Sequence, residues 1–402
     1  MHQPEPLLLL LLGQMTNRTT RIHRRNDGID TLRGWSILSV LFLHCWVHLP
    51  KAQELLQGVG KATTVIFRSG YYGVHLFFVI SGFLITTISL QRWGRLDKIS
   101  LPQFYRMRAA RILPCLLGLL AVLSVMHLLS LPGYTLPRTS LIQTIGAALT
   151  FTLNFLEAET GYFPACWDVL WSLSVEEMFY LFFPLLGRIA CRQRNFIAIL
   201  LLFVALGPFA RTVFSDNELW KDHSYLSCMD GIALGCLAAL VAQHIRLDKQ
   251  KFRLMLALGI GLCTFIGFFR KQAFALGLAE AGLNETVLAL GSGLLLIASQ
   301  EWYVKERHQG SKVFAPIRWF GRHSYEIYLT HGFVVLSIAK ILPSEEQTLM
   351  RVLTGTTIIA ILSGIVGQFV AVYFSEPLNR RFRSSVPEHN SAKNKELGKY
   401  RQ

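Results

Sequence analysis

The chain has 402 residues, of which 52% are hydrophobic and only 16% are charged. This composition, with its long apolar stretches, is typical of an integral membrane protein and excludes a disordered chain, which carries high charge and few aromatic residues. The apolar stretches are continuous rather than alternating, so we expect neither a transmembrane β-barrel nor a soluble α/β enzyme. Lysine and arginine number 40 against 25 acidic residues, a formal net charge of +15. In a membrane protein this excess collects in cytoplasmic loops, so it predicts a lipid bilayer and no nucleic acid as the partner.

The seven cysteines are scattered, lie mostly inside apolar stretches and form no C-x-x-C pair. This pattern predicts neither a disulfide framework nor a zinc site. We therefore expect no bound metal.

Eleven apolar stretches are found at 34–50, 71–91, 109–131, 140–156, 169–187, 195–213, 224–243, 254–269, 282–300, 323–340 and 352–375. The segments between them alternate between many and few basic residues. The rich segments hold 30 of the 40 lysines and arginines, and they are 1–33, 92–111, 188–195, 246–253, 301–322 and 376–402. Because basic loops remain in the cytoplasm, the rich segments are predicted to be cytoplasmic.

This alternation places 132–139 outside and 188–195 inside, so an odd number of crossings separates them. Two apolar stretches lie between, 140–156 and 169–187, and together they must make a single crossing that is broken or re-entrant. A broken segment at membrane depth is tolerated where it lines a cavity or is buried in protein. The predicted fold is therefore an all-α integral membrane protein with about ten transmembrane helices, one of them broken, and both termini in the cytoplasm.

The domain organisation follows from these spans. Residues 1–28 form a basic cytoplasmic segment, 29–380 the transmembrane domain, and 381–402 a basic, flexible cytoplasmic tail. The leucine run 7–12 is too short to cross a bilayer, which takes about 20 residues, and it lacks the flanks of a signal peptide. A translation start at Met15 would remove it, so we assign it no function.

Arg33 and His44 are the first candidate functional residues. Eleven residues separate them, which at ~100° per residue is within about 20° of three full turns, so both lie on one helix face. The rise of about 16 Å puts His44 near the middle of the membrane. A buried neutral imidazole is the plain interpretation; the functional one is a general base on the same face as a cytoplasmic-side cation.

A second candidate is the arginine pair Arg108 and Arg111, which share a helix face at a cytoplasmic boundary. Topology explains positive charge here but does not require arginine rather than lysine. Paired guanidinium groups suit phosphate.

The segment 167–180 lies at the predicted break. Ser174 and Glu177 form a capping box, which is the structural interpretation. It leaves Glu176 unexplained, because two adjacent carboxylates beside an apolar run need a cation, a histidine or a ligand. Tyr325, Tyr328 and His331 step by three along one further helix face, where an aromatic belt is the alternative for the tyrosines.

In order, these segments resemble the membrane acyltransferase-3 family, bacterial ten-span enzymes that often O-acetylate surface polysaccharides. The resemblance covers about residues 29–380. The matching motifs are Arg-x10-His at Arg33 and His44, Phe77–Phe83, Arg108–Pro114, Trp171–Tyr180, Asp230–Gly235, Gly321–His331 and Ser375–Asn379. His75 stands where many members carry aspartate.

The resemblance implies an acyl-CoA donor, usually acetyl-CoA, used as a substrate with no tightly bound cofactor. The acceptor would be a hydroxyl of a carbohydrate such as a lipopolysaccharide O-antigen or another surface polysaccharide, at the bacterial inner membrane. Arg108 and Arg111 would hold the donor phosphates, and Arg33 would line the entry. Catalysis would fall to His44 as general base, or alternatively as acyl-carrying nucleophile, with Glu176 or Glu177 orienting it. Supporting roles are assigned to Trp171, Ser172, Tyr180, Asp230, Tyr325, Tyr328 and His331.

Two other classes stay open. A multi-pass transporter would use the intramembrane charged residues as substrate or proton sites, yet it has no need of paired arginines beside a deep histidine. A non-catalytic receptor or assembly factor predicts that His44→Ala leaves function intact. The sequence leaves the acceptor, acyl length and oligomeric state open.

Overall fold

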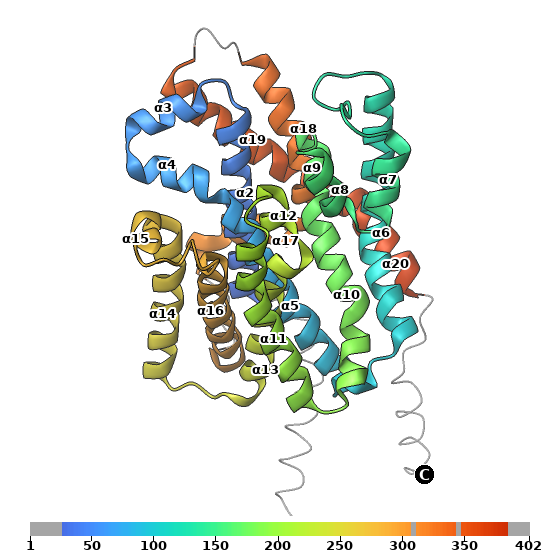
Figure 1. The fold of residues 1–402 in the computed structure, drawn as a ribbon, viewed down its shortest axis with the longest axis vertical. Coiled ribbons are helices and arrows are strands. Elements are labelled where there is room, and N and C mark those ends of the chain that lie inside the picture. Colours follow the sequence, from blue (N-terminus) through green and yellow to red (C-terminus); the bar gives the residue numbers. More distant parts are fainter. Residues whose placement is uncertain (1–25, 307–310, 343–346, 385–402) are drawn as a thin grey trace, which may run out of the picture.

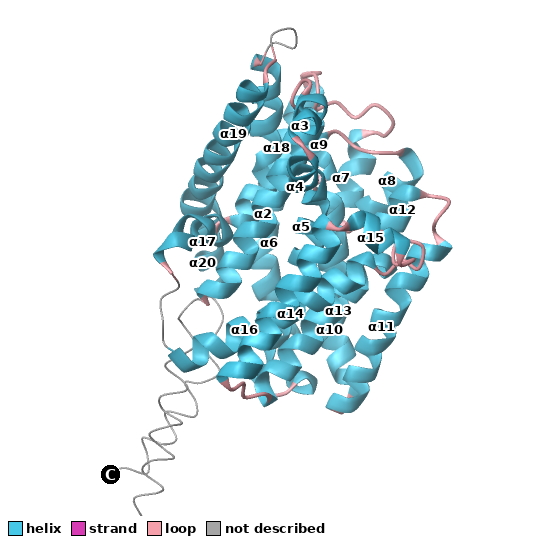
Figure 2. Ribbon diagram, turned by 90° about the vertical axis from the view of Figure 1, so that its left-hand side faces the viewer, coloured by secondary structure: helices cyan, strands magenta, loops and turns pink. Residues whose placement is uncertain are grey.

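The computed structural model describes residues 26–306, 311–342 and 347–384. Within these ranges the chain is helical and contains no strand (Figure 2), which confirms the all-α prediction. The leucine run and most of the predicted tail lie outside the described residues. The part of the tail that is described, up to residue 384, belongs to a helix that packs near α6.

Long helices make up most of the structure. They are α2 (Asp27–His48), α5 (Tyr72–Trp93), α6 (Leu101–Leu128), α10 (Leu170–Ala190), α11 (Gln193–Val213), α13 (Tyr225–His244), α14 (Lys249–Phe268), α16 (Asn284–Glu306), α18 (Ser324–Ile341) and α19 (Leu349–Val370). Short helices join them: α3 (Ala52–Val59), α4 (Lys61–Arg68), α7 (Leu141–Leu149), α8 (Leu153–Thr160), α9 (Ala165–Asp168), α12 (Glu218–His223), α15 (Arg270–Ala275), α17 (Ala315–Arg322) and α20 (Glu376–Ser384). Single turns at Ser69–Tyr71, Leu96–Lys98, Lys312–Phe314 and Ala371–Ser375 complete the chain.

Several long helices begin at a polar side chain that caps them. The Asn26 side chain accepts hydrogen bonds from the backbone at the start of α2, Ser224 does so for α13, and Asp248 for α14. Each cap satisfies a backbone N–H that has no partner in the first turn, which stabilises a helix by about 1 kcal/mol. The caps therefore fix where apolar segments begin.

Apolar helices long enough to cross a membrane number seven in the described chain, or eight if a bent pair is one span. The bent pair is α2 and α3, which meet at 114°. The seven are Lys61–Trp93, Leu101–Leu128, Ala165–Ala190, Gln193–Val213, Glu218–His244, Lys249–Phe268 and Leu349–Phe382. Helices α16 and α18 are long but carry more polar residues and are not in this set. The protein is thus a multi-pass membrane protein, while ten crossings stays a prediction.

The stretch 140–156 does not form a continuous helix. It divides into α7 and α8, of nine and eight residues, and Phe151 between them has a positive φ of 57°. At ~1.5 Å per residue neither is long enough to cross a bilayer. The apolar span continues only through α9 and α10, so the chain is broken where the charge pattern requires a broken crossing.

Close approach of backbones sets the packing of α5 against α13. A Cβ atom added at Gly82 of α5 would overlap the carbonyl oxygen of Ile232, and one at Gly235 of α13 would overlap that of Val79. Small residues at such a crossing let two helices pack with few intervening side chains. Two of the sequence motifs are therefore packed together, and they hold one wall of the site described below.

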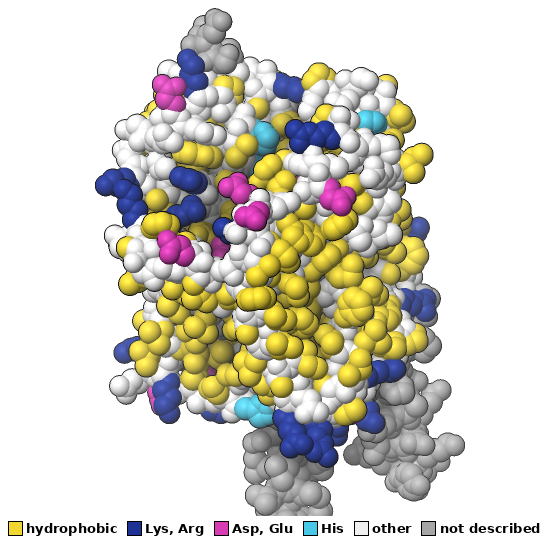
Figure 3. Space-filling view, in the orientation of Figure 1, with side chains coloured by type: hydrophobic (Ala, Val, Ile, Leu, Met, Phe, Trp, Pro, Cys, Tyr) yellow, Lys and Arg dark blue, Asp and Glu magenta, His cyan; other side chains and the backbone are white. Residues whose placement is uncertain are grey.

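The two ends of the molecule differ in charge. In Figure 1 the links from α10 to α11 and from α13 to α14 lie at the lower end, and Figure 3 shows lysine and arginine side chains gathered there. A broad band of hydrophobic side chains covers the surface above them (Figure 3). Helices α3, α7 and α8, from segments with few basic residues, lie in the upper half (Figure 1). The positive-inside rule makes the lower end cytoplasmic, which stays a prediction.

Candidate active site

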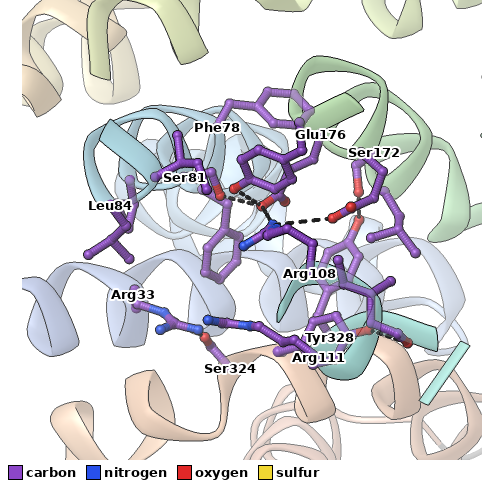
Figure 4. Close-up of a pocket in the computed structure, with 18 of the residues that line it drawn as sticks. Arg33, Phe78, Ser81, Leu84, Arg108, Arg111, Ser172, Glu176, Ser324 and Tyr328 are labelled. Atoms are coloured by element: carbon purple, nitrogen blue, oxygen red, sulfur yellow. Dashed lines mark hydrogen bonds and ion pairs between the residues drawn. The ribbon is translucent and has the colours of Figure 1, made fainter. Parts of the chain in front are cut away.

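A pocket lies between α2, α5, α6, α10 and α18 (Figure 4). Helix α5 supplies an apolar wall of Val74, Phe77, Phe78, Ile80, Leu84, Ile85 and Ile88. The polar lining comes from all five helices and comprises Arg33, Ser81, Arg108, Arg111, Ser172, Glu176, Glu177, Tyr180, Ser324, Tyr325 and Tyr328. We call this cavity the arginine pocket. Most of the residues predicted from motifs meet in it.

Arg108 is held by carboxylates within the pocket. Its Nη2 atom lies 3.3 Å from Glu177 Oε1 and 3.9 Å from Glu176 Oε1, and its guanidinium stands 3.5 Å from the Tyr180 ring centroid. Glu176 also accepts hydrogen bonds of 2.6 Å from the hydroxyls of Ser81 and Tyr180. Since a buried carboxylate needs a cation and hydrogen-bond donors, Arg108 is engaged with the two glutamates and not directed at a free anion.

Arg111 and Arg33 are arranged differently. Their guanidinium groups point toward one another beside Ser324 (Figure 4), and Arg33 Nε donates to Ser324 Oγ at 3.1 Å. Among the residues that the structure describes, no carboxylate lies within ion-pair distance of Arg111. Two like charges facing each other in a largely apolar pocket favour an anion between them. The predicted phosphate pair was Arg108 with Arg111, whereas the structure pairs Arg111 with Arg33.

Tyr325 and Tyr328 form the far side of the pocket. The Tyr328 hydroxyl is hydrogen-bonded to Ser172 Oγ at 2.6 Å, which joins α18 to the first turn of α10. The Tyr325 hydroxyl donates to the carbonyl of Ile112 at 3.3 Å. Both phenols therefore have a partner, and the Tyr328 ring, which lines the pocket, also contacts His331 behind it, with ring centroids 5.8 Å apart.

His44 lies beside His331 and does not line the pocket. Its ring meets His331 edge-on at 4.7 Å and stacks on His48 at 5.7 Å. His331 Nδ1 lies 2.7 Å from the carbonyl of Tyr328, which can only accept, so Nδ1 carries the hydrogen and Nε2 keeps a lone pair. His331 Nε2 and His44 Nδ1 are enclosed without a hydrogen-bond partner in the described structure. Arg33 and His44 thus contact the same helix, α18.

Neither glutamate is brought to His44. Both are drawn to the buried charge of Arg108, which is the stronger partner for a carboxylate than a neutral imidazole. A general base at His44 therefore acts without the orienting carboxylate that the sequence analysis assigned to Glu176 or Glu177.

Two further predicted residues lie outside the pocket. Trp171 stacks on His223, with ring centroids 3.8 Å apart. Asp230 is fully buried against Arg211, with Oδ2 and Nη2 separated by 2.6 Å, and it accepts a hydrogen bond from Thr286. This ion pair joins α11, α13 and α16, so the contacts of Asp230 are those of a residue that holds helices together.

The sequence analysis missed Ser81, Ser324, Glu157 and His223. Ser81 lies inside the motif Phe77–Phe83, which is otherwise apolar apart from Gly82, and Ser324 precedes the predicted tyrosine face. Glu157 follows an apolar stretch directly, where a carboxylate is costly, and that was an available signal. Nothing local marks His223, because its partners come from elsewhere in the chain.

The arrangement has the parts for transfer of a group carried by a phosphorylated donor. It combines a guanidinium pair, an apolar wall and histidines with unpartnered nitrogens. Among the described residues, no group of three or more histidine, cysteine, aspartate or glutamate side chains is placed to hold a metal ion.

The family is shown by its sequence profile. The profile described as an acyltransferase domain matches residues 26–376, nearly all of the described chain, and the protein belongs to that family. This confirms the resemblance drawn from the motifs. It also favours the acyltransferase interpretation over the transporter and receptor alternatives.

Several bacterial O-acetyltransferases are similar to this chain. The peptidoglycan O-acetyltransferase OatA of Listeria monocytogenes is 26% identical over 385 residues, covering 86% of this chain and 56% of that protein. The O-acetyltransferase OatA of Staphylococcus aureus is 24% identical over 327 residues, covering 77% and 51%. The putative peptidoglycan O-acetyltransferase YrhL of Bacillus subtilis is 26% identical over 340 residues, covering 79% and 50%. The chain spans about half the length of these relatives. No solved structure matches it.

Proposed function

We propose that this protein transfers an acetyl group from acetyl-CoA to a hydroxyl group on a peptidoglycan glycan strand. The acceptor oxygen forms a bond to the thioester carbonyl carbon, and the carbon–sulfur bond breaks. The hydroxyl proton passes by way of His44 to the departing thiolate, so the products are an O-acetyl ester and CoA. The observation that carries the proposal is the guanidinium pair of Arg33 and Arg111 inside the arginine pocket.

The donor fits this pocket by its chemistry. The phosphates of a CoA ester would lie between Arg33 and Arg111, where bidentate charge-assisted hydrogen bonds are available. The thin arm that ends in the thioester is mostly uncharged, and the wall of α5 offers it apolar contact. Arg108, with its charge offset by two glutamates, would shape the pocket more than it binds phosphate.

His44 is proposed as the general base. Its Nδ1 atom has no hydrogen-bond partner in the described chain, and His331 Nε2 beside it keeps a lone pair. A positioned base of this kind contributes a factor of about 10²–10⁴ in rate. We infer that Tyr328 and Ser172 close the route from the pocket to His44, and that their hydrogen bond opens during the catalytic cycle.

The relatives direct the choice of acceptor. Two of them are named for peptidoglycan, which favours cell-wall glycan over the lipopolysaccharide O-antigen that the motif resemblance implies. The bacterial sources of these relatives support a place in the bacterial inner membrane. With the basic end in the cytoplasm, acetyl-CoA would enter from there and the glycan would bind toward the opposite end.

Membranes containing the wild type or His44→Ala test the proposal. They are incubated with acetyl-labelled acetyl-CoA and purified peptidoglycan, and ester-bound label in the glycan and free CoA are measured. We expect transfer by the wild type and a loss of at least about 100-fold in His44→Ala, with acetyl-CoA binding kept. His127→Ala is the control, since His127 makes only a structural bond to the backbone of Leu136. Equal transfer by His44→Ala would contradict the assignment of the base.

A further inference from the structure

A second polar group lies on the other side of Trp171 from the arginine pocket. His223 stacks on Trp171 with the two ring planes 5° apart, whereas Ser172, the next residue of α10, lines the pocket. His223 Nδ1 lies 2.9 Å from Glu157 Oε2. The histidine keeps 6% of its surface exposed and the glutamate none. We call these two residues the Glu157–His223 pair.

The pair leaves one ring nitrogen available. A carboxylate that holds Nδ1–H fixes the tautomer, so Nε2 can accept a hydrogen. Nε2 has no hydrogen-bond partner among the described residues, and it is not one of the polar atoms that the protein encloses completely. The small exposed edge of the ring therefore includes Nε2.

Several acceptor atoms around the pair have no hydrogen-bond donor in the described chain. Glu157 Oε1 and Asp168 Oδ1 are enclosed without a donor in the described chain, and these two carboxyl groups face each other. Asn154 donates its amide hydrogen to the carbonyl of His223 at 2.9 Å, and its own Oδ1 has no donor. Every unpartnered atom here is an acceptor, and leaving such atoms unpartnered is costly. A proton shared by the two carboxyl groups can satisfy the enclosed oxygens, whereas Nε2, at the exposed edge of the ring, is the acceptor that the O–H of a ligand can reach.

An exposed aromatic residue stands beside the pair. Tyr162 is 67% exposed and its ring meets that of His223 edge-on at 6.2 Å. An aromatic face that is open on one side and polar at its tip suits a ligand with both an apolar face and hydroxyls, which is the character of a sugar ring. A pair whose only role is to join α8 to α12 would need neither this open ring nor the free Nε2.

We propose that the Glu157–His223 pair, with Asp168 and Tyr162, is the binding site for a hydroxyl of the carbohydrate acceptor. It binds by accepting the hydroxyl hydrogen at Nε2, while Tyr162 contacts the sugar face. The identity of the carbohydrate rests on the proposed function, whereas the preference for a hydroxyl follows from the acceptor nitrogen Nε2 of His223. The site is separate from the arginine pocket, which binds anions.

The test uses the full-length protein in nanodiscs and a disaccharide of N-acetylglucosamine and N-acetylmuramic acid as the probe. His223→Asn is the main variant, because the asparagine amide can keep the Nδ1 contact to Glu157 but has no atom in place of Nε2. Glu157→Gln is the second variant. His127→Asn is the control, a histidine that bonds to backbone through Nδ1 and lies outside both sites. Disaccharide binding, both Michaelis constants and thermal unfolding are measured.

We expect His223→Asn to raise the Kd and the KM of the disaccharide at least tenfold. The KM of acetyl-CoA should stay within twofold, and His127→Asn should match the wild type. The proposal is overturned if disaccharide affinity in His223→Asn stays within twofold of wild type. It is equally overturned if both pair variants lose acetyl-CoA affinity, kcat and thermal stability together, since that marks a structural role.

Measuring disaccharide binding directly distinguishes a failure of this proposal from a failure of the proposed function. If the wild type binds the disaccharide and His223→Asn does not, the site stands even where acetyl-CoA proves not to be the donor. If the wild type transfers acetyl to peptidoglycan but both pair variants bind the disaccharide normally, the enzyme assignment stands and this site is wrong.

Discussion

The arginine pocket and the Glu157–His223 pair lie back to back at the first turn of α10, yet they have opposite hydrogen-bonding character. The pocket presents guanidinium donors, whereas the pair presents ring and carboxyl acceptors. Adjacent residues divide them, since Trp171 stacks on His223 and Ser172 lines the pocket. Two consecutive residues of one helical turn thus contribute to two regions of different hydrogen-bonding character.

The two regions also differ in how their charges are balanced. In the pocket, Arg108 is offset by Glu176 and Glu177, while the guanidinium groups of Arg33 and Arg111 point toward one another beside Ser324. Around Glu157 and His223, no arginine or lysine makes an ion pair among the described residues. A phosphate is therefore favoured in the first region and disfavoured in the second. Three further substitutions test this contrast, in addition to His44→Ala and His223→Asn, which are described above.

Removing Arg108 should have the largest effect on stability. Arg108→Ala leaves two carboxylates in the pocket without their cation, and breaking a buried pair in this way costs about 3–5 kcal/mol. Unfolding in mixed micelles measures the loss. Arg95→Ala is the control, because its ion pair with Asp97 is exposed and should contribute little to stability. Equal stability of the two variants would show that Arg108 does not offset the glutamates.

Arg111→Ala should weaken binding of the donor without lowering the stability of the fold. Losing one charged hydrogen-bond partner of a phosphate costs about 1.5–3 kcal/mol, which is a tenfold or greater rise in the Kd of CoA. Stability should change little, because no carboxylate among the described residues lies within ion-pair distance of Arg111. Titration of CoA against the purified protein gives the Kd. A fall in stability as large as that of Arg108→Ala, with CoA affinity kept, would reverse the roles given to the two arginines.

Tyr328→Phe should have the smallest effect. It removes the hydrogen bond to Ser172 but keeps the ring, so it costs about 1 kcal/mol in stability. Because we infer that this bond closes the route from the pocket to His44, we expect the slow hydrolysis of acetyl-CoA by water to rise a few-fold. Ser172→Ala should behave alike. Unchanged hydrolysis in both variants would show that the hydrogen bond does not control passage.

The sequence alone located much of the fold through charge and hydropathy. The parity of crossings predicted a break near 140–156, where α7 and α8 are indeed too short to span. The bend of 114° between α2 and α3 was not predicted. A charge count reports which end a loop lies at and carries no information about bends within the apolar chain.

The candidate site was predictable where one helix carried the pattern. The spacing of Arg33 and His44 put both on one face, and the structure places both against α18. Partner choice was not predictable, because it depends on which side chains of different helices meet. Arg108 and Arg111 look equivalent in sequence, yet only Arg108 reaches the glutamates. For the same reason Glu157 and His223, on separate short helices, gave no joint signal.

The most direct test is the affinity of CoA for three proteins in nanodiscs: the wild type, Arg111→Ala and His223→Asn. The account predicts at least a tenfold loss for Arg111→Ala and a Kd within twofold of wild type for His223→Asn. Loss of CoA binding in His223→Asn with the fold intact, or full binding in Arg111→Ala, would contradict the separation of a donor pocket from an acceptor site.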